Sequence, residues 1–268
     1  MAENILEKII TKKTTRVNNL KKSITIESLK EKIDKNKTFI NFQDKILNNV
    51  NNNKISIIAE IKKASPSAGI IIQDYDPLSI AQIYNNNKAT CLSVLTEEDF
   101  FLGNLIHISK IKEKISLPIL CKDFFIDTYQ ITLAKSFGAD CILIILSAVD
   151  KELAKDLYQA ANDLNISTLI EVHSESEAEI ALSFEDSLIG INNRNLSTLE
   201  VSLNTSVQLS KILNSHNNPI ICESGIHTPK DIKFIIENAK IHNFLIGESL
   251  LKSNDIASQV REFTQINL

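Results

Sequence analysis

The chain has 268 residues, of which 43% are hydrophobic, and a formal net charge of −4 at pH 7. This length suits one large α/β domain of about 250 residues. The weakly acidic balance gives no basic footprint for nucleic acid, and the apolar runs are too short for a membrane helix of about 20 residues. Acidic residues in the opening MAENILEKII argue against a signal peptide. We therefore expect a cytoplasmic protein without nucleic-acid or membrane partners.

Residues 1 to about 50 carry three stretches with helical periodicity, ILEKII, IESLKEKI and NFQDKILNNV. The Asn-rich segment at 49–54 is typical of a loop. The sequence thus predicts an N-terminal helical extension, and two interpretations of it are open. The helices cover the floor of the domain that follows, or one of them, such as the helix containing Phe42, lies over a substrate-binding mouth.

Eight short apolar runs follow the extension. They are ISIIAEIK (55–62), ATCLSVLT (89–96), LPILCKD (117–123), ADCILIIL (139–146), ISTLIEV (166–172), SLIGINNR (187–194), NPIICESG (218–225) and HNFLIGES (242–249). Runs that are apolar on both faces are typical of buried parallel strands, and stretches with helical periodicity, such as 128–140 and 151–165, separate them. This alternation predicts a (β/α)8 TIM barrel of the α/β class over 55–268, which forms one domain (1–268) with the extension at 1–50.

Cysteine and histidine positions give no sign of a metal site. The cysteines all fall within predicted strands, where they would act as small buried hydrophobes: Cys91, Cys121, Cys141 and Cys222. No CxxC pair is present, and no histidine has a second histidine or cysteine at ligand spacing, although His173 and His227 lie just past strand ends. The chain also lacks a glycine-rich dinucleotide fingerprint and a P-loop. We expect neither a metal nor a cofactor.

Polar and charged side chains gather near the C-terminal ends of the predicted strands: Glu60, Lys62, Lys122, Glu171, Asn192, Arg194 and Glu223. Residues at i and i+2 of a strand point the same way, so Glu60 and Lys62 both project into the barrel. Buried charges are costly unless they pair or bind something. A pair such as Lys122 and Glu171 could be a satisfied internal ion pair. Several strands that each place polar groups at one end are nevertheless typical of a barrel active site.

Two glycine-containing turns predict a phosphate-binding site. Ser224 and Gly225 follow the seventh strand and precede a helix that opens at Thr228, whereas Gly247 stands between the eighth strand and the next helix. Backbone N–H groups at helix starts bind phosphate, and the loops after strands seven and eight are the usual place for this in TIM barrels. Either glycine alone could serve only for chain reversal. The loop after the first strand, which contains Ser65, is long enough to fold over a ligand.

Segments spread over nearly the whole chain resemble the indole-3-glycerol phosphate synthase family. They are IIAEIKKASPSAG, LSVLTEEDFFLG, PILCKDFFID, LIEVH, IGINNRNL, ICESGI and FLIGESLL. The AEIK…SPS, CKDF and GINNRNL motifs are highly specific in combination. The resemblance implies closure of 1-(o-carboxyphenylamino)-1-deoxyribulose 5-phosphate to indole-3-glycerol phosphate, with loss of CO2 and water. It implies no metal or organic cofactor, and no obligate protein partner is evident beside the phosphorylated small molecule.

The resemblance also implies roles for the charged residues. Lys122, in CKDF, is similar to the general acid that protonates the substrate ketone as the aromatic ring attacks it. Glu171, in LIEVH, resembles the carboxylate that acts as base. Lys62 and Glu60 resemble a second acid/base pair used in the later dehydration, and the division of proton transfers between the two lysines is left open.

The remaining matched residues are implied to bind and orient the substrate. Asn192 resembles the group that orients the catalytic carboxylate, and Arg194 the group that binds the substrate's own carboxylate. Glu223 is expected to line the sugar side. The groups implied to hold the phosphate are Ser65, Ser224, Gly225 and Gly247.

Two departures and two rival functions accompany the resemblance. Ala68 stands where many relatives have lysine in SPSKG, which removes one cationic contact from the first loop, and Glu248 stands where a small residue is also common. A Schiff-base aldolase that uses Lys122 or Lys62 would share the barrel and the phosphate site. A decayed barrel kept as a binding subunit is the third reading, which the intact set of acids and lysines argues against.

Overall fold

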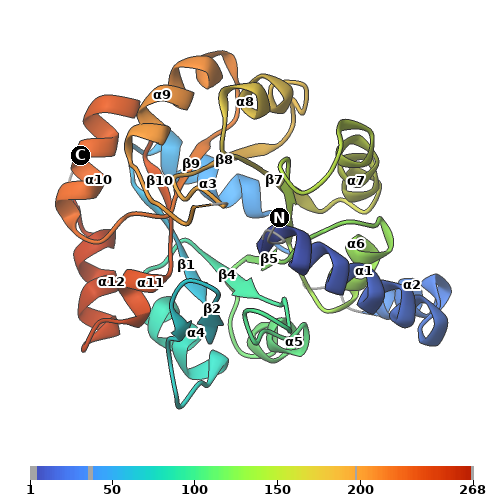
Figure 1. Ribbon diagram of the computed structural model, residues 1–268. Helices are drawn as coiled ribbons and strands as arrows, with labels where there is room; N and C mark the ends of the chain where they lie inside the picture. Colours follow the sequence, from blue (N-terminus) through green and yellow to red (C-terminus); the bar gives the residue numbers. More distant parts are fainter. Residues whose placement is uncertain (1–4, 36–38, 197, 267–268) are drawn as a thin grey trace.

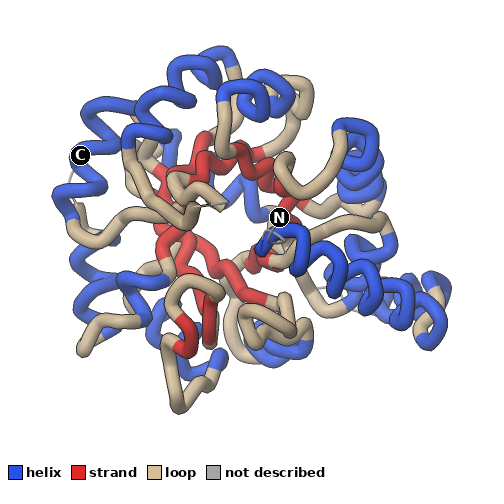
Figure 2. Tube along the Cα trace, viewed as in Figure 1, coloured by secondary structure: helices blue, strands red, loops and turns tan. Residues whose placement is uncertain are grey.

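A closed parallel barrel forms the centre of the computed structural model, which describes residues 5–35, 39–196 and 198–266. Its strands are β1 (Ser56–Ile61), β4 (Cys91–Leu95), β5 (Ile119–Lys122), β6 (Cys141–Ile145), β7 (Ser167–Val172), β8 (Leu188–Asn192), β9 (Ile220–Glu223) and β10 (Asn243–Ile246). Each strand pairs with its neighbours in chain order, and β10 closes the ring against β1. Figure 2 shows this ring of strands inside a ring of helices. The predicted TIM barrel is confirmed.

Helices cover the outside of the barrel (Figure 1). They are α4 (Pro77–Asn86), α5 (Ile106–Lys112), α6 (Tyr129–Ser136), α7 (Lys151–Asp163), α8 (Glu175–Ala181), α9 (Asn204–Ile212), α10 (Pro229–Ala239), α11 (Glu248–Leu251) and α12 (Ile256–Thr264), with a 3-10 turn η1 (Leu213–Ser215) after α9. Local sequence starts several of them. The carboxylate of Asp150, for example, accepts the N–H of Leu153 and caps α7. None of the helices in the described residues is long and apolar enough to cross a membrane.

Alternate strand residues face two different cores. Outward side chains such as Ile57 and Ile144 pack under the helices, whereas inward ones such as Ile58 and Leu143 fill the barrel. This double burial explains why the strands are apolar on both faces. The four cysteines are free and buried within these strands, as predicted.

The helix α3 (Phe42–Asn51) closes the N-terminal end of the barrel. Phe42 and Ile46 are fully buried against inward residues of the strands. At the other end of α3, the side-chain amide of Asn49 donates to Ser56 and Thr90, beside the starts of β1 and β4. The alternative that places the Phe42 helix over the substrate mouth is therefore wrong. The predicted loop at 49–54 also begins later than expected, because α3 continues to Asn51.

The helix α1 (Ile5–Ser23) lies at the opposite end, on the rim of the mouth, and leads into α2 (Ile26–Lys35). A buried ion-pair cluster anchors it. The Lys13 ammonium lies 2.7 Å from the Asp123 carboxylate and 2.9 Å from that of Glu98. Burial opposes the charge on Lys13, but these two carboxylates outweigh it and raise the pKa of the lysine. The extension thus covers the floor with α3 and borders the mouth with α1.

Candidate active site

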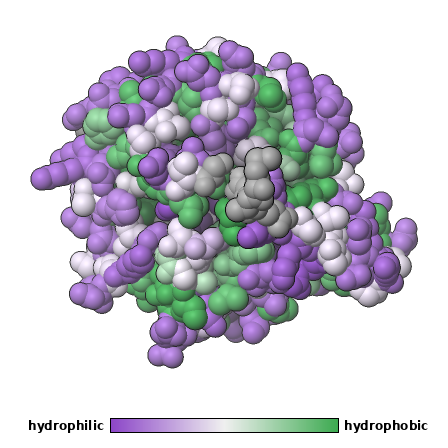
Figure 3. All heavy atoms as spheres, in the orientation of Figure 1, coloured by the Kyte–Doolittle hydropathy of each residue, from purple (hydrophilic) through white to green (hydrophobic). Residues whose placement is uncertain are grey.

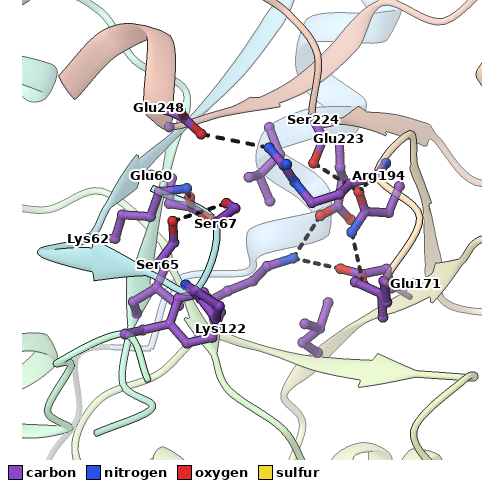
Figure 4. A pocket seen from close by; sticks show the side chains of 18 of the residues that line it. Glu60, Lys62, Ser65, Ser67, Lys122, Glu171, Arg194, Glu223, Ser224 and Glu248 are labelled. Atoms are coloured by element: carbon purple, nitrogen blue, oxygen red, sulfur yellow. Dashed lines mark hydrogen bonds and ion pairs between the residues drawn. The ribbon is translucent and has the colours of Figure 1, made fainter. Parts of the chain in front are cut away.

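The residues predicted to form the site converge on one pocket at the C-terminal ends of the strands (Figure 4). Its lining includes Glu60, Lys62, Ser65, Lys122, Glu171, Asn192, Arg194, Glu223, Ser224, Gly225 and Gly247. The β1 loop contributes through the short hairpin of β2 (Ala64–Ser65) and β3 (Gly69–Ile70), which places Ser65 at the mouth. Nothing predicted for the site lies outside this pocket.

Lys122 is the centre of a buried charge cluster. Its ammonium lies 2.7 Å from a carboxylate oxygen of Glu171 and 2.7 Å from one of Glu223. Burial disfavours the ammonium, but these carboxylates and that of Glu60 outweigh it and raise the pKa of Lys122 above its ordinary value. The lysine is therefore a stable cation that can give up its proton only to a strong base formed in its vicinity.

The cluster is one layer of the barrel interior. Its members Glu60, Lys122, Glu171 and Glu223 come from β1, β5, β7 and β9, which are alternate strands around the ring. A layer of a TIM barrel takes its side chains from alternate strands and is normally filled by branched apolar residues. Here the uppermost such layer is ionic. Sequence analysis identified its members but not the contact between Lys122 and Glu223, which reaches across the barrel.

The two carboxylates that share Lys122 differ in protonation. Burial opposes ionisation of Glu171, but the charges of Lys122 and His173 lower its pKa below the usual range. Burial raises the pKa of Glu223 to about 7, and the neighbouring charge of Glu171 adds to this rise while Lys122 opposes it. At neutral pH Glu171 is an ionised base. Glu223, by contrast, exchanges its proton near neutral pH.

A glycine makes room for Glu223. A Cβ atom on Gly190, in β8, would lie 2.0 Å from Oε1 of Glu223 and 3.3 Å from a methyl group of Leu169. No real side chain tolerates the first of these distances. Gly190 therefore allows a full-length glutamate to point across the barrel toward Lys122.

Glu60 and Lys62, on β1 and the residue after it, form a second ion pair in the pocket. The Lys62 ammonium lies 2.6 Å from Oε1 of Glu60. A Cβ atom on Gly247 would meet this same oxygen at 2.4 Å, so the glycine after β10 leaves the space that the Glu60 carboxylate occupies. Packing against Glu60 thus explains why residue 247 is a glycine, in addition to its predicted place near the phosphate.

Asn192 links the carboxylate of Glu171 to the loop after β9. Its amide N–H donates to Oε1 of Glu171 at 3.1 Å. Its amide oxygen accepts the Ser224 hydroxyl at 2.8 Å and the backbone N–H of Arg194 at 3.0 Å. Ser224 and Gly225 have φ values of 64° and 85°, the left-handed region that a tight turn requires and that glycine adopts without cost. The arrangement fits the orienting role expected of Asn192.

The guanidinium of Arg194 lies on the pocket wall (Figure 4). One N–H donates to the backbone carbonyl of Leu199 at 3.2 Å, and the carboxylate of Glu248 lies 3.7 Å away. Glu248 is also 2.6 Å from Lys252, so its carboxylate is shared between two cations. A forked cation on the wall of a pocket is suited to a carboxylate or phosphate of a ligand.

The helix after Gly225 differs from expectation. α10 has a capping box, in which the Asp231 carboxylate accepts the backbone N–H groups of His227 and Thr228. These N–H groups are already satisfied by an acid, so they do not offer the free donors predicted for phosphate. The Ser224–Gly225 turn and the segment at Gly247 remain the predicted places for phosphate binding. Ser65 lies across from them, and its hydroxyl accepts the N–H of Ala68 at 3.2 Å.

Sequence analysis did not identify the apolar part of the pocket wall. It comprises Ile5, Leu6, Ile9, Leu95, Phe101, Phe124, Leu143, Ile145, Leu196, Leu199, Ile226, Leu245 and Ile246. Figure 3 shows hydrophobic side chains toward the centre of this face, among hydrophilic ones at its edge. The residues from α1 could have been suspected from its amphipathic pattern, but not placed at the mouth. Such a wall suits a planar aromatic group.

No group of three or more His, Cys, Asp or Glu in the described ranges could hold a metal ion. The fold and the pocket together define a TIM-barrel enzyme whose pocket holds paired lysines and glutamates beside an apolar wall. The model of the indole-3-glycerol phosphate synthase family matches residues 6–263. The chain belongs to this family.

Named relatives agree with this assignment, and a solved structure shares the fold. The chain is 40% identical to an indole-3-glycerol phosphate synthase of Trichodesmium erythraeum, over 94% of this chain and 86% of that protein. It is 38% identical to an indole-3-glycerol phosphate synthase of Laribacter hongkongensis, over 94% of this chain and 95% of the relative. A crystal structure of 3-hexulose-6-phosphate synthase is similar in fold alone, with a TM-score of 0.61, 13% identity, and coverage of 78% of this chain and 98% of the other.

Proposed function

We propose that the chain closes 1-(o-carboxyphenylamino)-1-deoxyribulose 5-phosphate to indole-3-glycerol phosphate, with loss of CO2 and water, in tryptophan biosynthesis. The observation that carries the proposal is the cation of Lys122, held between Glu171 and Glu223 at the centre of the pocket. Membership of the synthase family supports the same reaction. The pocket also offers an anion-binding end and an apolar wall, which match the two ends of this substrate.

The first bond forms between an arene carbon and the ketone carbon of the substrate. The arene is a weak nucleophile, so the ketone oxygen must take a proton as it is attacked. Lys122 is the donor in this proposal, because its raised pKa keeps it protonated until the developing alkoxide becomes basic enough to accept. The bond between the arene carbon and the substrate carboxylate then breaks, CO2 leaves, and the electrons of this bond restore the aromatic ring. The product of these two steps is a ring-closed alcohol.

Loss of water completes the indole. The hydroxyl group made from the ketone needs a proton to leave, and the ring must give up a proton to become aromatic. Lys62 and its partner Glu60 supply an ammonium 2.6 Å from a carboxylate for the acid part of this step. Glu171 is the base, because its lowered pKa keeps it ionised and able to take a proton at neutral pH. The proton gained from the ring balances the one given to the leaving water.

Binding both ends of the substrate brings the two reacting carbons together. In this proposal Arg194 binds the substrate carboxylate, and Ser65, Ser224, Gly225 and Gly247 surround the phosphate. When a flexible substrate is bound at both ends, its reacting carbons are held close together and less entropy is lost on reaching the transition state. Glu223, which also contacts Lys122, would face the sugar between them.

Replacing Arg194 with alanine is expected to raise KM by about 10- to 150-fold with a smaller effect on kcat, because a charged hydrogen bond to a ligand contributes about 1.5–3 kcal/mol. Initial rates at varied substrate concentration measure both constants. Arg261→Ala is the matched control, since this arginine bonds to Asn87 and does not line the pocket. An unchanged KM in the Arg194 variant would contradict the carboxylate contact.

The proposed activity is tested by incubating the purified chain with the carboxyphenylamino sugar phosphate and following indole fluorescence. The chain contains no tryptophan, so the signal of the product stands on a low background. Formation of indole-3-glycerol phosphate with release of one CO2 is expected. A Schiff-base aldolase would instead be trapped on a lysine by borohydride, which requires an unprotonated amine that the raised pKa of Lys122 opposes. An inactive chain, or a trapped adduct, would refute the proposal.

We also propose that the chain acts in the cytoplasm as one domain. The packing supports one domain, because α3 fills the floor of the barrel and α1 is anchored on the rim of its mouth.

A further inference from the structure

A second group of charges lies directly behind Glu171, away from the pocket lining. The ring atom Nε2 of His173 is 3.2 Å from Oε1 of Glu171, and its Nδ1 is 3.2 Å from Oε2 of Glu177. The His173 side chain is 11% exposed. The contact with Glu171 is an ion pair whose angle departs from that of a hydrogen bond, since Nε2 has no hydrogen-bond acceptor in the described structure. Sequence analysis considered His173 only as a metal ligand.

The start of α8 fixes Glu177 in place. Ser174 caps this helix and accepts the N–H of Glu177 at 3.3 Å. In return, Oε1 of Glu177 accepts the Ser174 hydroxyl at 3.1 Å, and Oε2 accepts the backbone N–H of His173 at 2.8 Å. A capping arrangement of this kind leaves the carboxylate little freedom. Glu177 therefore presents a fixed acceptor to the outer side of the imidazole.

Glu171 is consequently held from both sides. Its Oε2 faces the ammonium of Lys122, and its Oε1 faces the amide of Asn192 and the imidazole of His173. Three ionisable groups thus surround the imidazole and the carboxylate it faces: Lys122 from β5, Glu223 from β9 and Glu177 from α8.

We propose that His173 is a positioning residue, which, held by Glu177, fixes the carboxylate of Glu171 for its work as base. The inference rests on the proposed function, because it names how the base of that reaction is aimed and kept charged. His173 does not line the pocket, so it acts through Glu171 rather than on the substrate.

The electrostatics agree with this geometry. Burial would lower the pKa of His173, but the carboxylates of Glu171 and Glu177 raise it to about 9. The imidazole is therefore a cation at neutral pH, and its charge helps to lower the pKa of Glu171. Removal of this cation raises the pKa of Glu171. The acid-side limb of the rate profile, which reports loss of the ionised base, then moves to higher pH.

The kinetic experiment compares His173→Asn, His173→Lys and Glu177→Gln with the wild-type chain. In His173→Asn, we expect kcat to fall by about 10- to 100-fold, since misplacing a catalytic group by about 1 Å costs up to about 100-fold. KM should stay within about three-fold, and the acid-side limb of kcat/KM should move to higher pH. His173→Lys keeps a positive charge beside Glu171, so the acid-side limb of kcat/KM should stay near its wild-type pH. Glu177→Gln should show a smaller fall in kcat.

The position of the limb separates positioning from a merely structural role, because partial unfolding lowers the amplitude of the profile without moving its limb. A near-normal kcat in His173→Asn would overturn the proposal, and so would a fall in kcat with an unmoved limb. The proposal would also be contradicted if the acid-side limb of kcat/KM moved as far in His173→Lys as it does in His173→Asn.

A titration of ¹⁵N-labelled histidine by NMR tests the pairing without any turnover, with His173→Asn to assign the signal. We expect the His173 imidazole to stay protonated through pH 8 and to lose its proton at lower pH in Glu171→Gln. A wild-type titration near the ordinary value of about 6.5 would overturn the inference even in an active enzyme. An inactive wild type with the expected titration would refute the ring closure alone.

Discussion

Lys122→Ala is expected to lower kcat by about 10²- to 10⁴-fold, the range that a positioned general acid contributes. The ketone oxygen loses the cation that stands between Glu171 and Glu223, and no other group replaces it at 2.7 Å from both. Substrate affinity should change little, because the proposed phosphate and carboxylate contacts come from other strands. Single-turnover kinetics measure the rate of the chemical step, and equilibrium binding of the product measures the affinity of the pocket.

The fold should survive this change. Without Lys122, two buried carboxylates face each other, but they relieve the repulsion by sharing a proton, which the pKa of about 7 for Glu223 already favours. Lys112→Ala is the matched control, because Lys112 lies 2.7 Å from the buried Asp140 at the floor of the barrel. Breaking that buried pair should cost stability, about 3–5 kcal/mol, and leave kcat of the folded chain unchanged. A Lys122 variant with near-normal kcat would exclude it as the acid.

The barrel and the membership of the site were predictable because both follow from strand geometry. Eight runs that are apolar on both faces have few other folds available, and side chains at i and i+2 necessarily share a wall. Glu60, Lys122, Glu171 and Glu223 could thus be assigned to one end of the barrel. The spacing of residues along the chain does not predict the distance between side chains on opposite sides of the barrel. The contact of Lys122 with Glu223 depends on side-chain length and on the space left by Gly190.

The errors have similar physical causes. An amphipathic helix shows which face is buried but not which end of a barrel it covers, so the helix with Phe42 could not be assigned to the floor. The start of α10 looked like a set of free N–H donors, although the carboxylate of Asp231, three residues after Thr228, accepts two of the N–H groups there. His173 was examined as a metal ligand and set aside, and its role beside Glu171 was not foreseen. Its partners Glu171 and Glu177 are close to it in the sequence, but closeness along the chain does not show that an acid points toward the imidazole.

Glu171→Gln is the second change with a large expected effect, a fall in kcat of about 10²- to 10⁴-fold, because glutamine keeps the shape of the side chain and cannot accept the proton. The pKa of Glu171 lies below its usual range, so the wild-type base is ionised at neutral pH and the loss should be seen throughout the neutral range. Raising the pH should not restore the variant. Rate profiles across pH measure this.

The same variant should remain folded, since Glu223 can take over as the partner of Lys122. The charge of Glu171 is part of what raises the pKa of Glu223, and its removal lets Glu223 ionise fully and pair with the ammonium. Asp140→Asn is the matched control: it neutralises a buried carboxylate that is also 2.7 Å from a lysine, and should lower stability without lowering kcat. Equal losses of kcat in the two variants would show that neutralising a buried carboxylate beside a lysine, and not the missing base, causes the effect.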